Sequence, residues 1–133
     1  MSNPVTPESY AKPNSEHSQQ VALFMWAQQM VRDGYYPELR WMFAVPNGGD
    51  RRASVAAALV AEGVKSGVSD IMLPVACGGM HGLFIEMKRP QPPGRLSREQ
   101  KEFQAAMTLQ GYETATCWTW LEAVEVICDY LTK

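Results

Sequence analysis

Residues 69–90 read SDIMLPVACGGMHGLFIEMKRP, and this stretch decides the fold of the chain. It contains two β-rich runs, residues 70–76 and 82–88, separated by Cys77-Gly78-Gly79-Met80. Glycines suit a tight turn because they adopt positive φ without strain. The stretch therefore predicts a β-hairpin at the centre of the domain.

Three charged residues of this hairpin are expected to meet at one end of the sheet. Successive side chains of a strand point to opposite faces, so Glu86 and Lys88 share a face, while Asp70 opens the partner run. Two carboxylates held close together repel each other, and a hard divalent cation such as Mg²⁺ relieves that repulsion. A nearby lysine can then orient a water molecule or stabilise the negative charge of a phosphodiester under attack.

A purely structural interpretation stands beside this one. Asp70 and Lys88 can form a cross-strand ion pair, with Glu86 simply solvated. An isolated ExK recurs in many unrelated proteins, and by itself it favours that interpretation. Three features of the surrounding sequence favour the catalytic interpretation. They are the order of the predicted elements, an acid on the first helix and a basic loop after the lysine.

The flanking sequence predicts helices on both sides of the hairpin. Ser15 can cap a helix that ends at Asp33-Gly34, and Thr119 and Glu122 have the spacing of a capping box. We expect helices over residues 15–32, 51–62, 97–109 and from 119 onwards, strands over 39–45 and 112–117, and irregular structure over 46–49 and 89–96. The order predicts one α/β domain over residues 14–133, with a mixed sheet flanked by helices, after a flexible tail of residues 1–13.

Composition and charge narrow the class of protein. The chain has 133 residues, 46% of them hydrophobic, which suits one domain with a single core. Its apolar runs are too short for a membrane span, and a secretory signal is not evident. Three cysteines without CxxC spacing favour a reducing compartment over disulfides or zinc. We expect a cytoplasmic protein, of a bacterium or a phage-infected cell, associated with DNA.

The basic residues fall into two groups although the net charge is −2. A slightly negative net charge argues against a protein that coats nucleic acid through bulk positive charge. Each group is open to two interpretations, a solvated face or a local strip that binds phosphates. The first group is Arg51, Arg52 and Lys65, and the second is Lys88, Arg89, Arg95, Arg98 and Lys101.

Several motifs of the chain resemble the VRR-NUC nucleases, the virus-type replication-repair branch of the PD-(D/E)xK superfamily. The likeness runs from about residue 15 to 127 and implies a restriction-endonuclease-like fold. The motifs, in the family's order, are SEHSQQ, PNGG with the following RR, GVKSGVSDIMLP, GLFIEMKRP and LSREQKEFQAAMTLQGYETATCWTWLEAVEVI. One departure is Ser69, which stands where the superfamily name has proline.

The resemblance implies a role for each matching residue. Asp70 and Glu86 would ligate Mg²⁺ or Mn²⁺ together with the backbone carbonyl of Met87, and Lys88 would be the catalytic lysine. Glu16 would reach the metal mainly through water, although an acid in a first helical turn also suits the helix dipole. The remaining catalytic residue, Gln100, would lie beside the centre, although its spacing from Ser97 also suits a capping box. From the grouping of basic residues, we expect Arg51, Arg52, Lys65 and Arg89 to bind DNA.

The function implied is a metal-dependent endonuclease that cuts branched DNA. A chain with one active site and no added domain is expected to resolve four-way (Holliday) junctions in DNA repair as a homodimer, because two strands must be cut. The alternative is a non-catalytic nucleic-acid-binding or assembly module that keeps the nuclease fold. An intact set of Asp70, Glu86 and Lys88 favours the enzyme, because a binding module has no need of a repulsive acid pair.

Overall fold

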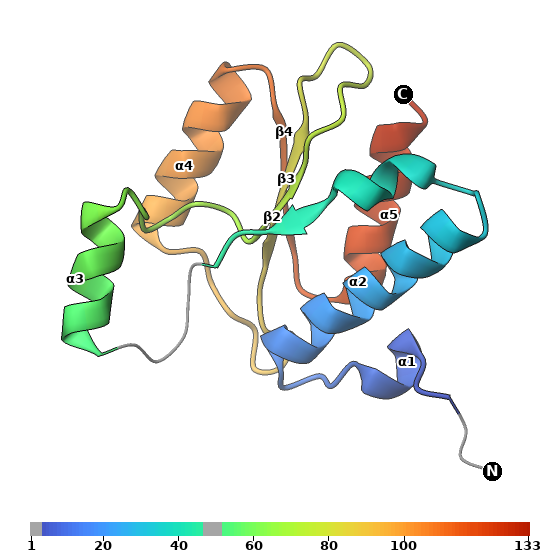
Figure 1. Cartoon of the computed structure of the whole chain (residues 1–133), viewed down its shortest axis with the longest axis horizontal. Coiled ribbons are helices and arrows are strands. Elements are labelled where there is room, and N and C mark those ends of the chain that lie inside the picture. The colour runs from blue at the N-terminus through green and yellow to red at the C-terminus, as the bar shows by residue number, and fades with distance from the viewer. Residues whose placement is uncertain (1–3, 47–51) are drawn as a thin grey trace.

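A computed structural model describes residues 4–46 and 52–133 of the chain, which form a small sheet covered by helices (Figure 1). No helix in the described ranges is long and apolar enough to cross a membrane. The elements are α1 (Pro7–Tyr10), α2 (Glu16–Arg32), the 3₁₀ helix η1 (Pro37–Trp41), β1 (Phe43–Ala44), α3 (Ala53–Ala61), β2 (Ile71–Leu73), β3 (Leu83–Met87), α4 (Arg98–Leu109), β4 (Glu113–Cys117) and α5 (Trp120–Leu131).

The predicted hairpin is present and forms the middle of a four-stranded sheet with the order β1-β2-β3-β4. β2 pairs antiparallel with both β1 and β3, and β3 pairs parallel with β4. The register places Ile71 opposite Ile85 and Leu73 opposite Leu83. β2 is shorter than expected and stops before Pro74, which lacks the N–H that a strand uses for pairing.

Helices cover the two faces of the sheet, as expected for an α/β domain. α2 and α5 lie on one face, and α4 lies on the other (Figure 1). The core is on the α2–α5 side, where Ile85 and Met87 of β3 are fully buried against residues such as Leu23 and Ile127. On the α4 side Phe84 meets Phe103 edge to face, with ring centroids 5.1 Å apart. Residues 84, 86 and 88 therefore face α4.

The predicted caps of α2 and α5 are confirmed. The hydroxyl of Ser15 accepts a hydrogen bond from the Ser18 amide at 3.0 Å. At α5, the hydroxyl of Thr119 accepts from the Glu122 amide at 3.1 Å, and the Glu122 carboxylate accepts from the Thr119 amide at 3.1 Å. Such bonds satisfy amides that have no partner inside the helix, so the start of each helix is determined locally.

The strand expected over residues 39–45 is wrong for most of its length. Residues 37–41 form η1, and only Phe43 and Ala44 are in a strand. Pro37 occupies the first turn of η1, where its fixed φ suits a helix. Leu39 is buried beneath α2 while Trp41 is 60% exposed. The alternation of large apolar residues that predicted a strand therefore lies in a 3₁₀ helix.

Two further segments differ from expectation. Within the stretch expected to be a flexible tail, residues 7–10 form α1, whose N-cap Thr6 makes a capping box with Ser9. The carbonyl of Pro13 accepts a hydrogen bond from the Gln91 amide at 2.6 Å, which ties this stretch to the loop after β3. The other segment is α3, which confirms the helix expected over residues 51–62 but is shorter, Ala53–Ala61, and buries none of its residues. The expected PNGG turn beyond Pro46, and Arg51, lie outside the described residues.

Candidate active site

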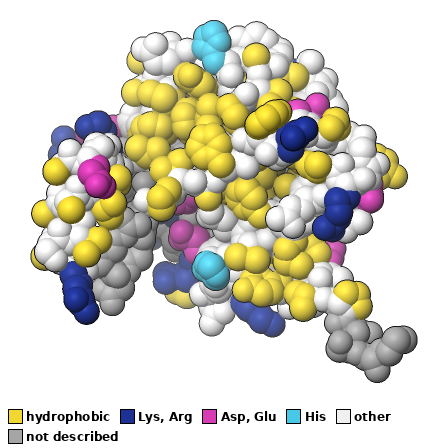
Figure 2. Space-filling model, in the orientation of Figure 1, with side chains coloured by type: hydrophobic (Ala, Val, Ile, Leu, Met, Phe, Trp, Pro, Cys, Tyr) yellow, Lys and Arg dark blue, Asp and Glu magenta, His cyan; other side chains and the backbone are white. Residues whose placement is uncertain are grey.

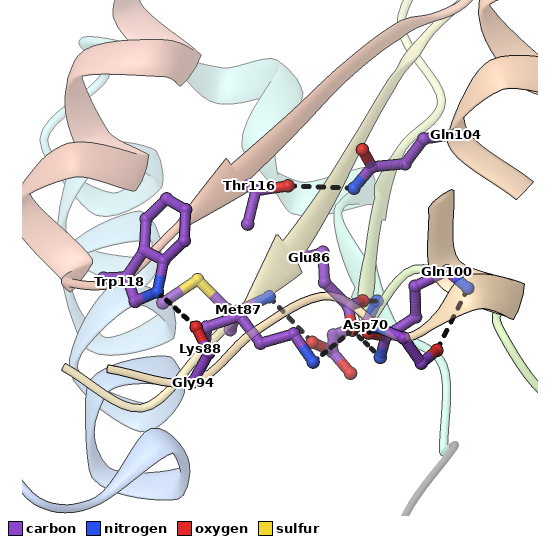
Figure 3. A network of polar contacts seen from close by, with 10 residues as sticks. Asp70, Glu86, Met87, Lys88, Gly94, Gln100, Gln104, Thr116 and Trp118 are labelled. Carbon is purple, nitrogen blue, oxygen red and sulfur yellow. Dashed lines mark hydrogen bonds and ion pairs between the residues drawn. The ribbon is translucent and has the colours of Figure 1, made fainter. Parts of the chain in front are cut away.

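The carboxylates of Asp70 and Glu86 lie side by side at the end of the hairpin (Figure 3). The Asp70 amide donates a hydrogen bond to Glu86 Oε2 at 3.1 Å, and the Met87 amide donates to Asp70 Oδ2 at 2.7 Å. Each acid is therefore held by the backbone of the other strand. The hairpin register predicted this proximity, and the antiparallel pairing confirms it.

Burial makes ionisation of this pair unfavourable. Glu86 is 2% exposed. Loss of solvation, followed by the nearby charge of Asp70, raises the pKa of Glu86 to about 8. Loss of solvation also raises the pKa of Asp70, against the bond from the Met87 amide and the charge of Lys88. The alternative in which Glu86 is simply solvated is therefore wrong.

Lys88 brings a positive charge to the same site. Its Nζ lies 3.7 Å from Glu86 Oε1, and its side chain is 13% exposed. Its amide donates to the carbonyl of Cys117 at 2.8 Å, which continues the pairing of β3 with β4 beyond the end of β3. The ion pair is thus formed with Glu86, the neighbour on the same face, rather than with Asp70 across the strands.

Gln100 makes contacts both in the cap of α4 and beside the acid pair. Its Oε1 accepts from the Ser97 amide at 2.8 Å, which completes the capping box of α4. Its Nε2 donates to Glu86 Oε1. One amide side chain therefore connects the start of α4 to the buried carboxylate (Figure 3). Ser97, predicted from the sequence only as a helix cap, is therefore also a positioning residue for Gln100.

Glu16 stands across a hollow from Asp70. Both residues line a cavity of about 660 Å³ that continues along α2 past Val21 and Phe24 to Val45. Partial desolvation and the charge of Asp70 raise the pKa of Glu16, while Lys88 and Arg89 lower it. Glu16 is therefore close enough to Asp70, Lys88 and Arg89 to feel their charges.

The donor set suits a hard divalent cation. Within residues 4–46 and 52–133, no group of three or more His, Cys, Asp or Glu side chains is arranged to hold a metal ion by itself. Mg²⁺ commonly uses one or two carboxylates, keeps several waters and needs no complete protein cage. Asp70 and Glu86 supply two such carboxylates, and a cation bound between them would offset the repulsion and loss of solvation that raise the pKa of Glu86.

Among the described residues that were expected to bind DNA, only Arg89 is adjacent in the chain to a residue of this site. Arg89 directly follows Lys88, and its Nε donates to the carbonyl of Pro92 at 2.8 Å, which shapes the loop after β3. Arg52 is the exposed N-cap of α3, and Lys65 is exposed in the loop after α3. Arg51 lies outside the described residues.

The wall of the cavity on α2 was not predicted from the sequence. Gln20, Phe24 and Gln28 line it together with Glu16, and these four residues are spaced by four along α2. Side chains at i and i+4 stack on one face of a helix, so the spacing was a usable signal. Near the site, Gln104 Nε2 also donates to Thr116 Oγ1 at 2.9 Å, one turn along α4 from Gln100.

Replacing Glu86 with glutamine is expected to make the metal-free protein less sensitive to pH. The pKa of Glu86 is raised from 4.5 to about 8 in the folded state. Between these values the folded protein holds a proton that the unfolded chain releases, so stability falls as pH rises through this window. Glu86→Gln should add on the order of 2 kcal/mol of stability at pH 8 and much less at pH 5.

Urea unfolding in EDTA at both pH values measures this difference. Glu102→Gln is the matched control, because Glu102 is exposed on α4 and pairs with Arg98 on the surface. A gain for Glu86→Gln that does not depend on pH would contradict the explanation by ionisation.

Comparison with known proteins identifies the family and the fold. The family model described as VRR-NUC domain matches residues 14–119 of the chain. A solved structure titled "VRR_NUC domain protein" has a TM-score of 0.74 and 24% sequence identity, covering 89% of this chain and 88% of the other. No curated protein matches the sequence. The fold is therefore that of a VRR-NUC domain protein, and the chain belongs to the VRR-NUC domain family.

Proposed function

We propose that this chain is a phosphodiesterase that cuts DNA with a divalent cation, Mg²⁺ or Mn²⁺. The VRR-NUC family implies a nuclease-type fold and suggests nuclease activity. The observation that carries the proposal is the convergence of Asp70, Glu86, Lys88 and Gln100 on one point at the end of the hairpin. A binding module has no need to bury two acids against each other at a cost in stability.

The side chains of the site would have different roles in hydrolysis. Asp70 and Glu86, with the carbonyl of Met87, would hold the cation, and Glu16 would reach it through water. When bound, the cation neutralises phosphate charge and makes a water molecule a stronger nucleophile.

Lys88 would stabilise the negative charge that develops on the phosphate and orient the attacking water; its ammonium, 3.7 Å from Glu86, supports this role. Gln100 holds Glu86 in position through a bond that is fixed at its other end by the helix cap. Arg51, Arg52, Lys65 and Arg89 would contact phosphates of the DNA.

A cleavage assay tests the proposal directly. Duplex, flap, single-stranded and four-way-junction DNA are incubated with the protein in EDTA, Mg²⁺, Mn²⁺ or Ca²⁺. Cleavage that requires Mg²⁺ or Mn²⁺ is expected on at least one branched substrate. Binding to DNA without cleavage in any metal would instead support the non-catalytic module.

We further propose that the protein acts on four-way junctions as a homodimer. One chain supplies one acid pair, whereas a junction needs matched cuts in two strands. α3 favours such a contact, because it stands apart from the sheet and leaves Val55 and Val60 47% and 68% exposed (Figure 1). A two-fold axis brings the same patch of two copies together.

Sedimentation at micromolar concentration measures the stoichiometry. Val60→Lys should shift the protein to monomer and abolish paired cuts in the two strands of a junction, while leaving single cuts. A wild-type monomer that still resolves junctions symmetrically would contradict the homodimer.

A further inference from the structure

A groove leads away from the acid pair along α2. The cavity that contains Glu16 and Asp70 shares two lining residues, Phe24 and Gln28, with a second hollow of about 390 Å³. The second hollow continues to Arg32 on α2 and Arg40 on η1. The two hollows are thus successive parts of one groove between α2 and the η1–β1 segment.

Five residues spaced by four form the α2 wall of this groove, and their chemistry changes along it. They are Glu16, Gln20, Phe24, Gln28 and Arg32. The helix rises 1.5 Å per residue and has 3.6 residues per turn, so the wall extends about 24 Å along the axis while it winds part of the way around the helix. It begins with the acids of the candidate metal site and ends with arginine. The middle is apolar, with Val21, Met25 and Val45 beside Phe24.

The two arginines are available to a ligand. Among the ion pairs formed by the described residues, none involves Arg32 or Arg40. Both residues are exposed, and the Arg40 guanidinium lies 4.8 Å from the ring centroid of Trp41. Asp33 and Glu38 are close in sequence, but Asp33 already accepts a hydrogen bond from Gln29 at 3.0 Å. Figure 2 shows basic side chains over η1 and the far part of α2, and both acidic and basic ones beside the start of α2.

We infer that the groove binds a single-stranded segment of DNA that leaves the cleavage site along α2. The part of this inference that concerns the acid end rests on the proposed nuclease function but not on the four-way junction, whose arms are fully paired. The groove is long enough for about four nucleotides, the lower end of the site sizes of single-strand-binding grooves. The segment's phosphates would pair with Arg32 and Arg40, and an unstacked base would pack against Phe24.

Duplex DNA fits the groove less well, because the middle of the groove is apolar. A duplex keeps its bases stacked inside and presents phosphates, which gain nothing from an apolar wall. An unpaired strand exposes the flat faces of its bases, and these pack well on aromatic and apolar side chains. Gln20 and Gln28 add amide groups that hydrogen-bond to base edges without requiring one sequence.

Binding of tailed DNA in EDTA tests the inference without any cleavage. Fluorescence anisotropy compares a blunt duplex with the same duplex carrying single-stranded tails of increasing length at either end. Affinity should rise with tail length and stop rising near about four nucleotides. The Arg32→Ala/Arg40→Ala protein should bind tailed DNA about tenfold more weakly. Its salt slope, the dependence of the logarithm of the binding constant on the logarithm of the salt concentration, should be smaller by about 1.4. Its affinity for blunt duplex should equal that of the wild type.

Phe24→Ala should weaken binding of tailed DNA by about tenfold, with little change in the salt slope. Because Phe24 also packs against the core, its folding is checked by circular dichroism, and Gln28→Glu serves as a second variant that places negative charge in the groove. Arg98→Ala and Leu109→Ala are the matched controls, since both residues are exposed on α4, on the opposite face of the sheet.

The outcomes separate this inference from the proposed function. An equal loss of affinity for blunt and tailed DNA in the arginine variant would overturn the groove, even if cleavage were normal. Affinity that does not depend on tail length would overturn it as well. A wild-type protein that binds tails with the expected length dependence but cuts nothing in Mg²⁺ would leave the groove intact and refute the nuclease.

Discussion

Asp70→Asn, Glu86→Gln and Lys88→Met are each expected to reduce metal-dependent cleavage by on the order of a thousandfold or more, while the protein stays folded. Each substitution removes a charge and nearly preserves shape. Loss of either carboxylate would weaken binding of the cation. Loss of the Lys88 ammonium, which lies 3.7 Å from Glu86, would leave the negative charge on the phosphate without a positive side chain beside it. None of the three side chains belongs to the apolar core between the sheet and the α2–α5 layer.

Single-turnover cleavage in Mg²⁺ measures this effect, and urea unfolding checks the fold of each variant. Glu102→Gln and Lys101→Met are matched controls, because they remove the same charges from exposed positions on α4. Both controls should cut as the wild type does. Full activity in folded Lys88→Met or Glu86→Gln protein would show that the site lies elsewhere.

Gly67→Ala is expected to have the largest effect on stability. Gly67 has φ +89°, where an L side chain is strained. A Cβ there would lie 2.6 Å from the backbone oxygen of Glu99, in the first turn of α4. The helix start must move to relieve that contact, and Gln100, the next residue, would move with it. We expect a loss of about 3 kcal/mol, from left-handed strain and overpacking together.

Gly63→Ala separates the two causes. Gly63 has φ +103°, but a Cβ there meets nothing within 4 Å. It should therefore cost only the backbone strain, about 1–2 kcal/mol, and leave cleavage unchanged at temperatures where the protein is folded. Gly67→Ala should also reduce cleavage under such conditions, because it disturbs the bond from Gln100 to Glu86. Equal losses of stability in the two variants would contradict the close packing of Gly67 on α4.

The sequence alone determined the parts of this fold that depend on local chemistry. The caps of α2, α4 and α5 are short-range hydrogen bonds between residues three apart, so the side chains at these positions are sufficient to predict them. The hairpin follows from two β-rich runs around glycines, and its alternation places Glu86 and Lys88 on one face. From the hairpin alone, Asp70 could be expected beside Glu86.

The tertiary structure decided what depends on contacts between distant elements. Leu39 and Trp41 alternate like residues of a strand, and only packing of Leu39 beneath α2 distinguishes η1 from a strand. The burial of Glu86, and with it the rise of its pKa, needs α4 laid across the sheet. Gln100 reaches Glu86 for the same reason, although its role in the helix cap is readable from local sequence.

The groove along α2 is the clearest case of this division. The spacing of Glu16, Gln20, Phe24, Gln28 and Arg32 is a property of the sequence, but a stripe of mixed polarity predicts no particular surface. Its opposite wall comes from η1 and the end of β1, which the chain reaches only after it has turned back across α2. A helix face becomes a groove when a second element stands beside it, and that placement is set by burial of Leu23 and Leu39 in the common core.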